Sequence, residues 1–376
     1  MSALLKEHFG YLSDAVKVRR YREAIAKVVR GNDVVADLGC GSGVLGLACL
    51  RAGARFVHCI DETPFIDVAR RTLTDAGYGL QAAFHRARSQ HIELPERVDV
   101  LVCDHVGFFG VDYGILGMLA DAQRRFLKPG GAVIPAELRL SVAGVESETC
   151  RNLVDGWRGD QVPSDYHWVG DLAAEAKHPV DLAAADLISE SAEFATIIPG
   201  AEVRSFFSRT ADLIASRDGG LDGVAGWFDC RLGADVWMTN SPNADERLQR
   251  PQAFLPLSRP VPLAAGDAIR VTVMARPGDH LLRWIVELPA SGQRFAHSTW
   301  NGLLLDHADL ARAKPDRVAT LNARGHARQI ILGYCDGTRT AQAVEQQVLR
   351  DHPDLFPSVE ELSRFVARVL GTDTGA

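Results

Sequence analysis

The fold of this chain is decided by one glycine-rich stretch, Asp37-Leu38-Gly39-Cys40-Gly41-Ser42-Gly43. A short apolar run, 34–38, leads into its first glycine, and a helical pattern, 44–52, follows its last. Glycine lets the backbone turn tightly and approach a ligand closely, because a side chain at these positions would intrude. We therefore predict a strand that ends in a ligand-binding turn and continues into a helix.

The residues around this stretch predict a parallel sheet. Two more apolar runs follow at 56–61 and 98–104, and a helical pattern lies between them at 65–76. Strands that alternate with helices at this spacing form βαβ units in a doubly wound sheet. Residues 127–131 (Leu-Lys-Pro-Gly-Gly) are expected to be a turn that ends a helix, and the chain is expected to resume as strand at 132–135.

A carboxylate at the end of the second apolar run supports a ligand site. Asp61 follows Gly43 by 18 residues. In a doubly wound sheet it faces the same crevice as the glycine turn, where it can accept hydrogen bonds from ribose hydroxyls. The spelling Gly-x-Gly-x-Gly differs from the Gly-x-Gly-x-x-Gly of dinucleotide binders, and no Gly-Lys-Ser/Thr is present to hold a triphosphate.

The pattern changes at about residue 140. Short alternating runs separated by turn residues predict an all-β second domain, a sandwich or barrel, although 151–200 is helix-poor and hard to place. The last part of the chain predicts a third, small unit. Its expected elements are a weak strand at 318–322, a helix at 327–334, a helix capped by Thr340 that runs to Leu349, and a closing helix after a capping box at Ser358.

Composition excludes several classes of protein. Apolar residues make up 47% and charged residues 24% of the 376, as in ordinary globular proteins. The net charge of −7 argues against general nucleic-acid binding and gives no support for a membrane partner. No run reaches the ~18 apolar residues of a membrane span, and the start lacks a signal-peptide pattern. Seven scattered cysteines without Cys-x-x-Cys disfavour disulfides and zinc, so we expect a cytoplasmic protein with no metal.

With these surroundings, the glycine-rich stretch resembles motif I of class I S-adenosylmethionine-dependent methyltransferases. The resemblance implies that S-adenosylmethionine is the cofactor and S-adenosylhomocysteine the product. It also implies that the glycines shape the pocket for methionine and ribose, and that an acid at 61, or alternatively at 62, binds the ribose hydroxyls. The cofactor-binding residues implied at this edge of the sheet are Asp37, Gly39, Gly41, Gly43, Asp61 and Glu62.

The resemblance extends to the protein arginine methyltransferases, from about residue 8 to about residue 305. His8-Phe9-Gly10 and Tyr21-Arg22 look like the helix that covers the cofactor in that family, and Trp227-Phe228-Asp229 looks like part of its barrel. The family's arginine for the cofactor carboxylate falls on Lys17, which keeps the charge but loses the bidentate fork. The family's glutamate for adenine falls on Gln90, beside Ser89, and an amide can still bond the exocyclic amine.

The departures from that family concern the methyl acceptor. The family holds guanidinium between two glutamates of one loop, and here the first falls on Asp104 and the second on Tyr113, with Asp112 one residue away. Its Thr-His-Trp turn falls on Arg247-Leu248-Gln249. Guanidinium needs paired carboxylates to leave water, so we expect an oxygen, an imidazole or amine nitrogen, or an acidic carbon as the acceptor. Asp104 and His105 are candidate bases, and Asp112 and Tyr113 are candidates to orient the substrate.

The C-terminal segment, 306–376, has motifs of its own. Thr320-Leu321-Asn322, Ile330-Ile331-Leu332 and the turn from Cys335 to Thr340 resemble the PqqD-like family, small winged-helix modules that recognise leader segments of ribosomally made peptides. The family's mode is addition of the leader as a strand to an open sheet edge; an oligomerisation or lid domain is the alternative. The expected fold class is α/β plus β. Its domains are a Rossmann-like doubly wound domain at 1–136, a β-barrel domain at 137–305 and a winged helix at 306–376.

Together these features predict a methyltransferase that modifies a ribosomally made precursor peptide, with the leader held by residues 306–376. Two alternatives stay open. One is a protein or free-arginine N-methyltransferase that uses Asp104 and Asp112. The other is a catalytically idle adaptor that binds the cofactor and presents a peptide to a partner enzyme. The arginine methyltransferase family commonly dimerises through an arm, which residues 150–185 could supply, so a homodimer is expected.

Overall fold

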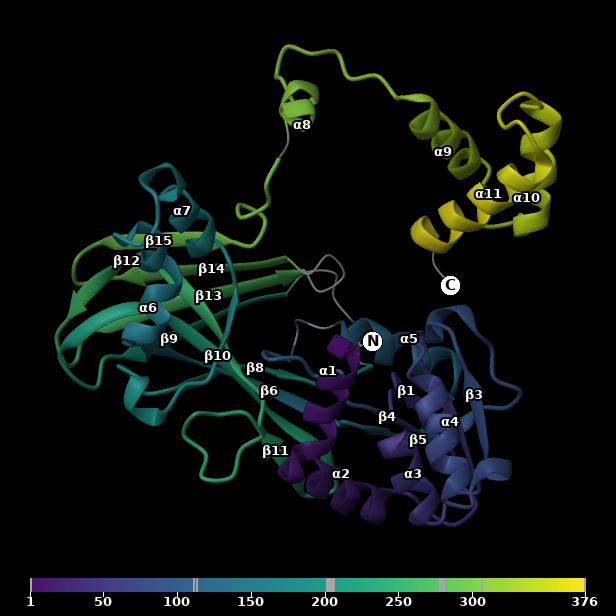
Figure 1. Cartoon of the computed structure of the whole chain (residues 1–376), viewed down its shortest axis with the longest axis horizontal. Coiled ribbons are helices and arrows are strands. Elements are labelled where there is room, and N and C mark those ends of the chain that lie inside the picture. Colours follow the sequence, from purple (N-terminus) through teal and green to yellow (C-terminus); the bar gives the residue numbers. More distant parts are fainter. Residues whose placement is uncertain are drawn as a thin grey trace. The chain divides into compact units, whose positions relative to one another are not determined.

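The computed structural model describes residues 2–110, 112, 114–200, 207–276, 281–305 and 307–374. The chain divides into two compact units, with the boundary between Leu303 and Leu304 (Figure 1). The further division of the first unit at residue 136 stays a prediction. Among the described residues, no helix has the length and apolar character needed to cross a bilayer.

The first unit begins with two helices and a parallel sheet. The strands lie in the order β3-β2-β1-β4-β5, so the order reverses between β1 and β4, where doubly wound folds place their ligands. The strands are β1 (Val34–Leu38), β2 (Phe56–Ile60), β3 (Ala82–His85), β4 (Val98–Cys103) and β5 (Leu127–Ile134). The helices are α1 (Ser2–Ser13), α2 (Ala15–Val28), α3 (Val44–Arg51), α4 (Ile66–Asp75) and α5 (Ile115–Arg125). The predicted doubly wound sheet is confirmed.

One expectation for this sheet is wrong. Residues 127–131 form part of β5 rather than a turn that ends a helix. Leu127 pairs with Val98 and Ala132 pairs with Val100, so the residues between them bulge out of the ladder. Proline and glycine weaken strand pairing locally, but the pairs on both sides keep the segment in the sheet as a bulge.

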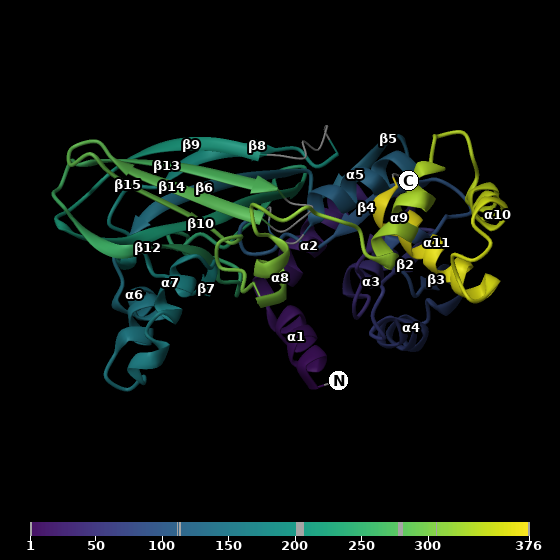
Figure 2. The same cartoon turned by 90° about the horizontal axis from the view of Figure 1, so that it is seen from above.

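Two antiparallel sheets complete the first unit as a barrel-like part (Figure 2). One has the order β7-β12-β10-β6-β8 with β11 beside β10, and the other has the order β15-β14-β13-β9. A bridge between Ser189 and Ala215 joins segments next to β8 and β9. The strands are β6 (Glu137–Val145), β7 (His178–Val180), β8 (Ala192–Ile197), β9 (Phe207–Ile214), β10 (Gly219–Gly233), β11 (Val236–Thr239), β12 (Gln252–Leu263), β13 (Ala268–Arg276), β14 (Leu281–Leu288) and β15 (Gln293–Ser298).

The segment expected to be helix-poor contains several short helices. They are α6 (Glu148–Asp155), α7 (Val169–Ala174) and the single 3-10 turns η3 (Gly156–Arg158), η4 (Ser164–Tyr166) and η5 (Ala184–Asp186). Figure 2 shows α6 and α7 beside β12. Helices of six to eight residues span about two turns, too few for a clear apolar period in the sequence.

The second unit is helical. Its helices are α8 (His307–Arg312), α9 (Ala323–Gly333), α10 (Ala341–Asp351) and α11 (Val359–Asp373). Thr340 and Ser358 cap α10 and α11 as predicted, with side chains that accept from the backbone N–H groups of Ala343 and Glu361. A small core joins α9, α10 and α11. Its buried members are Ile331, Val344, Val348, Leu362, Val366 and Val369.

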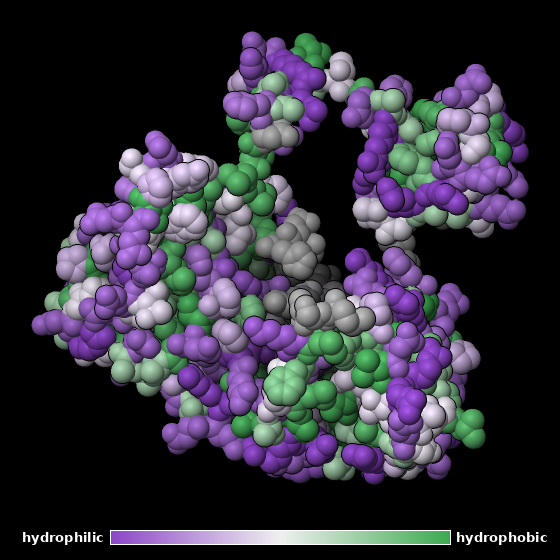
Figure 3. Space-filling model, in the orientation of Figure 1, coloured by the Kyte–Doolittle hydropathy of each residue, from purple (hydrophilic) through white to green (hydrophobic). Residues whose placement is uncertain are grey.

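The strand expected at 318–322 is absent. These residues have no regular structure, and Val318 and Leu321 are exposed. Within residues 307–374 the structure has no strand at all, and a strand without a paired neighbour is not stable in water. The residues that precede α8 are also apolar and exposed, namely Leu303, Leu304 and Leu305, and Figure 3 shows this stretch coloured as hydrophobic.

Candidate active site

A cavity of about 690 Å³ lies beside the carboxyl ends of the parallel strands. Three segments that are far apart in the sequence line it: helices α1 and α2, the loop after β4, and the residues just before β12. The lining residues are Lys6, Glu7, Gly10, Tyr11, Asp14, Lys17, Asp104, His105, Gly107, Phe108, Gln249, Arg250 and Pro251. Two of the four predicted catalytic residues, Asp104 and His105, therefore share this cavity.

The glycine turn adjoins the cavity through His105. Gly39 and Gly41 have φ angles of +64° and +50°, a left-handed conformation that favours glycine. A β-carbon at Gly39 would collide with the imidazole of His105, and one at Gly41 would collide with the imidazole of His8. The turn is thus a bare backbone surface against which flat groups pack closely.

Asp61 is bound to this turn, as the sequence predicted from its place after β2. Its Oδ2 accepts a hydrogen bond from the backbone N–H of Gly41 at 2.8 Å. Its Oδ1 accepts from the backbone N–H of Thr63 at 2.7 Å and from the Thr63 hydroxyl at 2.6 Å. Each carboxylate oxygen can accept more than one hydrogen bond, so Asp61 can fix the turn and still receive ribose hydroxyls.

Asp37 lies below the turn rather than facing the cavity. Its Oδ2 accepts from the backbone N–H of Gly46 at 2.8 Å, near the start of α3. Its Oδ1 is buried with no hydrogen-bond partner among the described residues. Burial raises the pKa of Asp37 to about 7. The bare turn and the carboxylate of Asp61 fit a nucleoside-bearing cofactor, whereas Asp37 supports the turn from beneath.

The remaining predicted cofactor residues differ in whether their side chains are already engaged by other residues. Glu62 is exposed and forms an ion pair with Arg88, with Nε and Oε2 2.7 Å apart. Ser89 is buried, and its hydroxyl donates weakly to Gln90 at 3.4 Å. Arg125 donates to the Ser89 carbonyl at 2.5 Å and thereby holds this single helical turn in place. Asp61 is therefore better placed than Glu62 to act as the acid at the turn.

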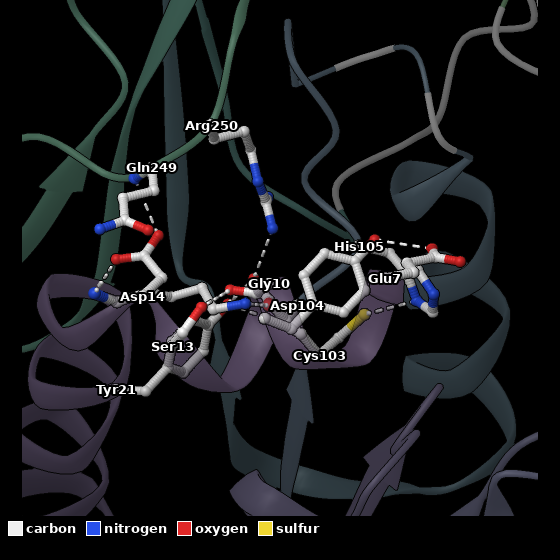
Figure 4. A network of polar contacts seen from close by, with 12 residues as sticks. Glu7, Gly10, Ser13, Asp14, Tyr21, Cys103, Asp104, His105, Gln249 and Arg250 are labelled. Atoms are coloured by element: carbon white, nitrogen blue, oxygen red, sulfur yellow. Dashed lines mark hydrogen bonds and ion pairs between the residues drawn. The ribbon is translucent and has the colours of Figure 1, made fainter. Parts of the chain in front are cut away.

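A buried ion cluster centres on Asp104 at the end of β4 (Figure 4). The Nζ of Lys17 lies 2.7 Å from Oδ2 of Asp104, and Nη2 of Arg250 lies 3.5 Å from Oδ1. The hydroxyl of Tyr21 donates to the Cys103 carbonyl at 2.8 Å and approaches Asp104 at 3.3 Å. Burial opposes the charge of Asp104, but Arg250 and Lys17 outweigh it and lower the pKa of this carboxyl. Asp104 is thus held as an anion between two cations of its own chain.

Asp14 attaches the barrel-like part to helix α2. Its carboxylate caps the helix by accepting from the backbone N–H of Lys17 at 3.0 Å. The other oxygen accepts from the backbone N–H of Gln249 at 2.9 Å (Figure 4). Lys17 makes the first of these contacts, and Arg250 follows Gln249, which makes the second. Asp14 thereby brings Lys17 and Arg250 to the walls of the same cavity.

His105 is a half-buried imidazole at the wall between the glycine turn and the cavity. Its Nδ1 lies 3.8 Å from the Sγ of Cys103. Burial lowers the pKa of His105 despite the neighbouring Asp104, so the ring is neutral near neutral pH. A neutral imidazole can accept a proton.

Asp112 is placed apart from Asp104. It accepts hydrogen bonds from the backbone N–H groups of Phe108 and Phe109 at 3.3 and 3.1 Å. Its Oδ2 also lies 2.5 Å from the Nζ of Lys177. The carboxylate therefore shapes the loop after β4 and does not line the cavity. Tyr113 lies outside the described residues.

Sequence reasoning missed Arg250 and Tyr11 as members of the site. Arg250 lies two residues before the buried strand β12, and a charged residue so close to such a strand is a usable signal. Tyr11 lies on α1 with Lys17 over its ring at 4.4 Å. Its pKa rises well above the usual value because of burial and its hydrogen bond to Glu7.

Comparisons with known proteins agree with this geometry. A methyltransferase-domain family matches residues 35–131. The arginine N(omega)-methyltransferase of Streptomyces achromogenes subsp. streptozoticus is 27% identical over 280 residues, which are 70% of this chain and 74% of that protein. A probable protein arginine N-methyltransferase 6 of Arabidopsis thaliana is 30% identical over 155 residues, 40% of this chain. This chain spans only about a third (35%) of the plant protein's length.

Solved structures show the same fold. The Trypanosoma brucei PRMT1 enzyme–prozyme heterotetrameric complex with AdoHcy matches with a TM-score of 0.70 at 20% identity, covering 77% of this chain and 96% of that one. Protein arginine methyltransferase 10 of Arabidopsis thaliana matches with a TM-score of 0.67 at 20% identity, covering 78% and 98%. Residues 35–131 are therefore a methyltransferase domain, and the chain shares the fold of protein arginine methyltransferases.

Proposed function

We propose that this chain methylates an acceptor other than a guanidinium group. The observation that supports this is the pairing of both acids of the loop after β4 with cations of the same chain. Asp104 contacts Lys17 and Arg250, and Asp112 contacts Lys177. A substrate guanidinium at Asp104 would be a third cation around one buried carboxylate, and its desolvation would not be compensated. A neutral or anionic acceptor meets no such penalty.

The residues of the chain have distinct roles in this proposal. S-adenosylmethionine, when bound, supplies an electrophilic methyl group. Asp61 and the glycine turn would hold its nucleoside part, and Lys17, in the wall of the cavity, would hold its amino-acid part. The neutral imidazole of His105 accepts the proton that the acceptor atom loses as it becomes methylated. Asp104 fixes the two cations that shape the cavity and takes no proton itself.

We propose further that the acceptor belongs to a ribosomally made precursor peptide whose leader binds residues 306–376. The support is the likeness of this segment to PqqD-like modules and its own small core. Because residues 307–374 contain no strand, the proposed contact is with helices α9, α10 and α11 rather than with a sheet edge.

The test is methylation of the short peptide encoded beside this gene, followed by mass spectrometry. We expect a gain of one methyl mass, located by fragmentation outside arginine, and competition by an excess of the free leader. Methylation that the leader does not affect would refute the leader proposal. Binding of S-adenosylhomocysteine with no methyl transfer to any substrate would support the idle adaptor instead.

Arginine methylation is the second candidate, and the names of the relatives favour it. The same assay with free arginine and with an arginine-rich peptide decides between the two. Methylarginine formed at a rate equal to or above that of the precursor peptide would show that a guanidinium displaces Arg250 or Lys17 from Asp104. That result would refute the acceptor proposed here.

We also propose a homodimer formed through the segment 150–185. It presents three exposed aromatic side chains, Trp157, Tyr166 and Trp168. Aromatic residues are enriched in protein interfaces, and three of them close together in the sequence are rarely left in water without a partner. Light scattering of the purified chain should give twice the mass of 40.8 kDa.

A further inference from the structure

In the buried ion cluster, two cations contact one carboxylate. Lys17, Asp104 and Arg250 have side chains that are only 5%, 21% and 10% exposed. Asp14, the N-cap of α2, and Glu7 also line this cavity. The carboxylate of Asp14 accepts from two backbone N–H groups, and that of Glu7 accepts from the Tyr11 hydroxyl. Lys17 and Arg250 therefore share the carboxylate of Asp104, and their remaining N–H donors can serve one further anion.

Arg250 is the less satisfied of the two cations. Lys17 lies at a normal charged hydrogen-bond distance from Asp104, 2.7 Å. The contacts of Arg250 are longer: Nη2 lies 3.5 Å from Asp104, and Nη1 donates to the Gly107 carbonyl at 3.4 Å. A guanidinium has five N–H donors that match a carboxylate in a bidentate fork. Its position in the cavity wall allows those donors to meet a ligand.

The anion that reaches this cavity can be identified from the cofactor. His105 lies against Gly39 of the glycine turn and lines the same cavity as Arg250. A cofactor seated on the turn therefore extends into a space walled by Lys17 and Arg250. S-adenosylmethionine contains one anionic group, the carboxylate of its methionine part.

We infer that Arg250, from the barrel-like part, binds the methionine carboxylate of the cofactor together with Lys17. Arg250 supplies the bidentate hold that a lysine at position 17 cannot give. Lys17 on α2 and Arg250 before β12 thus bind the same carboxylate, so that cofactor binding links the parallel sheet to the barrel-like part. This inference rests on the use of S-adenosylmethionine and not on the acceptor proposed above.

The test compares two ligands of which only one has this carboxylate. S-adenosylhomocysteine has the complete amino-acid part, whereas 5′-methylthioadenosine has the same nucleoside and thioether but lacks both the carboxylate and the ammonium group. Arg250 is a cation and can hold the carboxylate but not the ammonium, so a loss confined to S-adenosylhomocysteine reports the carboxylate. Calorimetry on the full chain measures both affinities for the wild type, Arg250→Met, Arg250→Lys and Lys17→Met. Arg247→Met is the matched control, because Arg247 is on the same segment but donates to the Leu182 carbonyl outside the cavity.

We expect Arg250→Met to lower the affinity for S-adenosylhomocysteine by about ten- to a hundredfold, which is the usual effect of losing a charged hydrogen bond. The affinity for 5′-methylthioadenosine should stay unchanged. Arg250→Lys should give a smaller loss, and the control none. Equal affinity of wild type and Arg250→Met for S-adenosylhomocysteine would overturn the inference. An equal loss for both ligands would overturn it too, because it would show a general change of the pocket. Binding of 5′-methylthioadenosine also reports that each variant is folded.

Discussion

Replacing Asp104 by asparagine tests the buried ion cluster directly. The change keeps the shape of the side chain but removes the negative charge that contacts both Lys17 and Arg250. Breaking a buried ion pair costs about 3–5 kcal/mol when the partner charge stays buried. The side chain of Asp104 is 21% exposed, so water can reach the two cations in the variant and reduce that cost. We therefore expect Asp104→Asn to lower the free energy of unfolding by about 2–4 kcal/mol.

The pH dependence of this loss follows from the lowered pKa of Asp104. A carboxyl whose folded-state pKa is depressed contributes stability above its unfolded pKa, about 3.9, and loses it as the pH falls through the folded pKa. The difference between wild type and Asp104→Asn should be complete near neutral pH and should shrink below about pH 4.

Urea denaturation followed by fluorescence at several pH values measures both effects. The matched control is Asp235→Asn, because Asp235 also pairs with a lysine, Lys27 at 2.6 Å, but on an exposed surface. Surface pairs contribute little, so this variant should unfold like the wild type. A loss of less than about 0.5 kcal/mol in Asp104→Asn, or one that does not change with pH, would refute the reasoning.

Four further predictions concern the turn, its carboxylate, the proposed dimer segment and the second unit. Gly41→Ala should weaken S-adenosylhomocysteine binding, since the new β-carbon would meet His8. Calorimetry measures the loss in this variant and in the double variant Gly41→Ala/His8→Ala. Full recovery of the affinity in the double variant would assign the loss to that collision alone. Asp61→Asn should weaken S-adenosylhomocysteine binding about tenfold. It should also lower the unfolding midpoint, because an amide cannot accept from both Gly41 and Thr63 as the carboxylate does. Normal affinity would contradict the role of Asp61. Trp157→Ala should shift the light-scattering mass toward that of the monomer, and a wild type that is already monomeric would contradict this expectation. Ile331→Ala should destabilise the second unit by about 2–5 kcal/mol without altering the affinity for S-adenosylhomocysteine. A loss of that affinity would contradict the second expectation.

The features that the sequence alone determined are local or periodic. The strand at 34–38 and the glycine turn after it are visible because a wholly buried strand is a continuous apolar run and a left-handed turn needs glycine. Asp61 is predictable because parallel strands end at the same edge of the sheet. Thr340 and Ser358 cap their helices from three residues away, which is again a local pattern.

Tertiary structure decided what lies far apart in the sequence. Lys17 and Asp104 are 87 residues apart, and Arg250 contacts a carbonyl 143 residues before it. No periodic pattern encodes such distances, because they depend on how α2 and the barrel-like part pack on the parallel sheet. The same reason explains the strand wrongly expected at 318–322, since a strand exists only where another strand pairs with it. The glycine turn and Asp61 thus follow from the sequence, whereas the charge state of Asp104 and the position of Arg250 follow from packing.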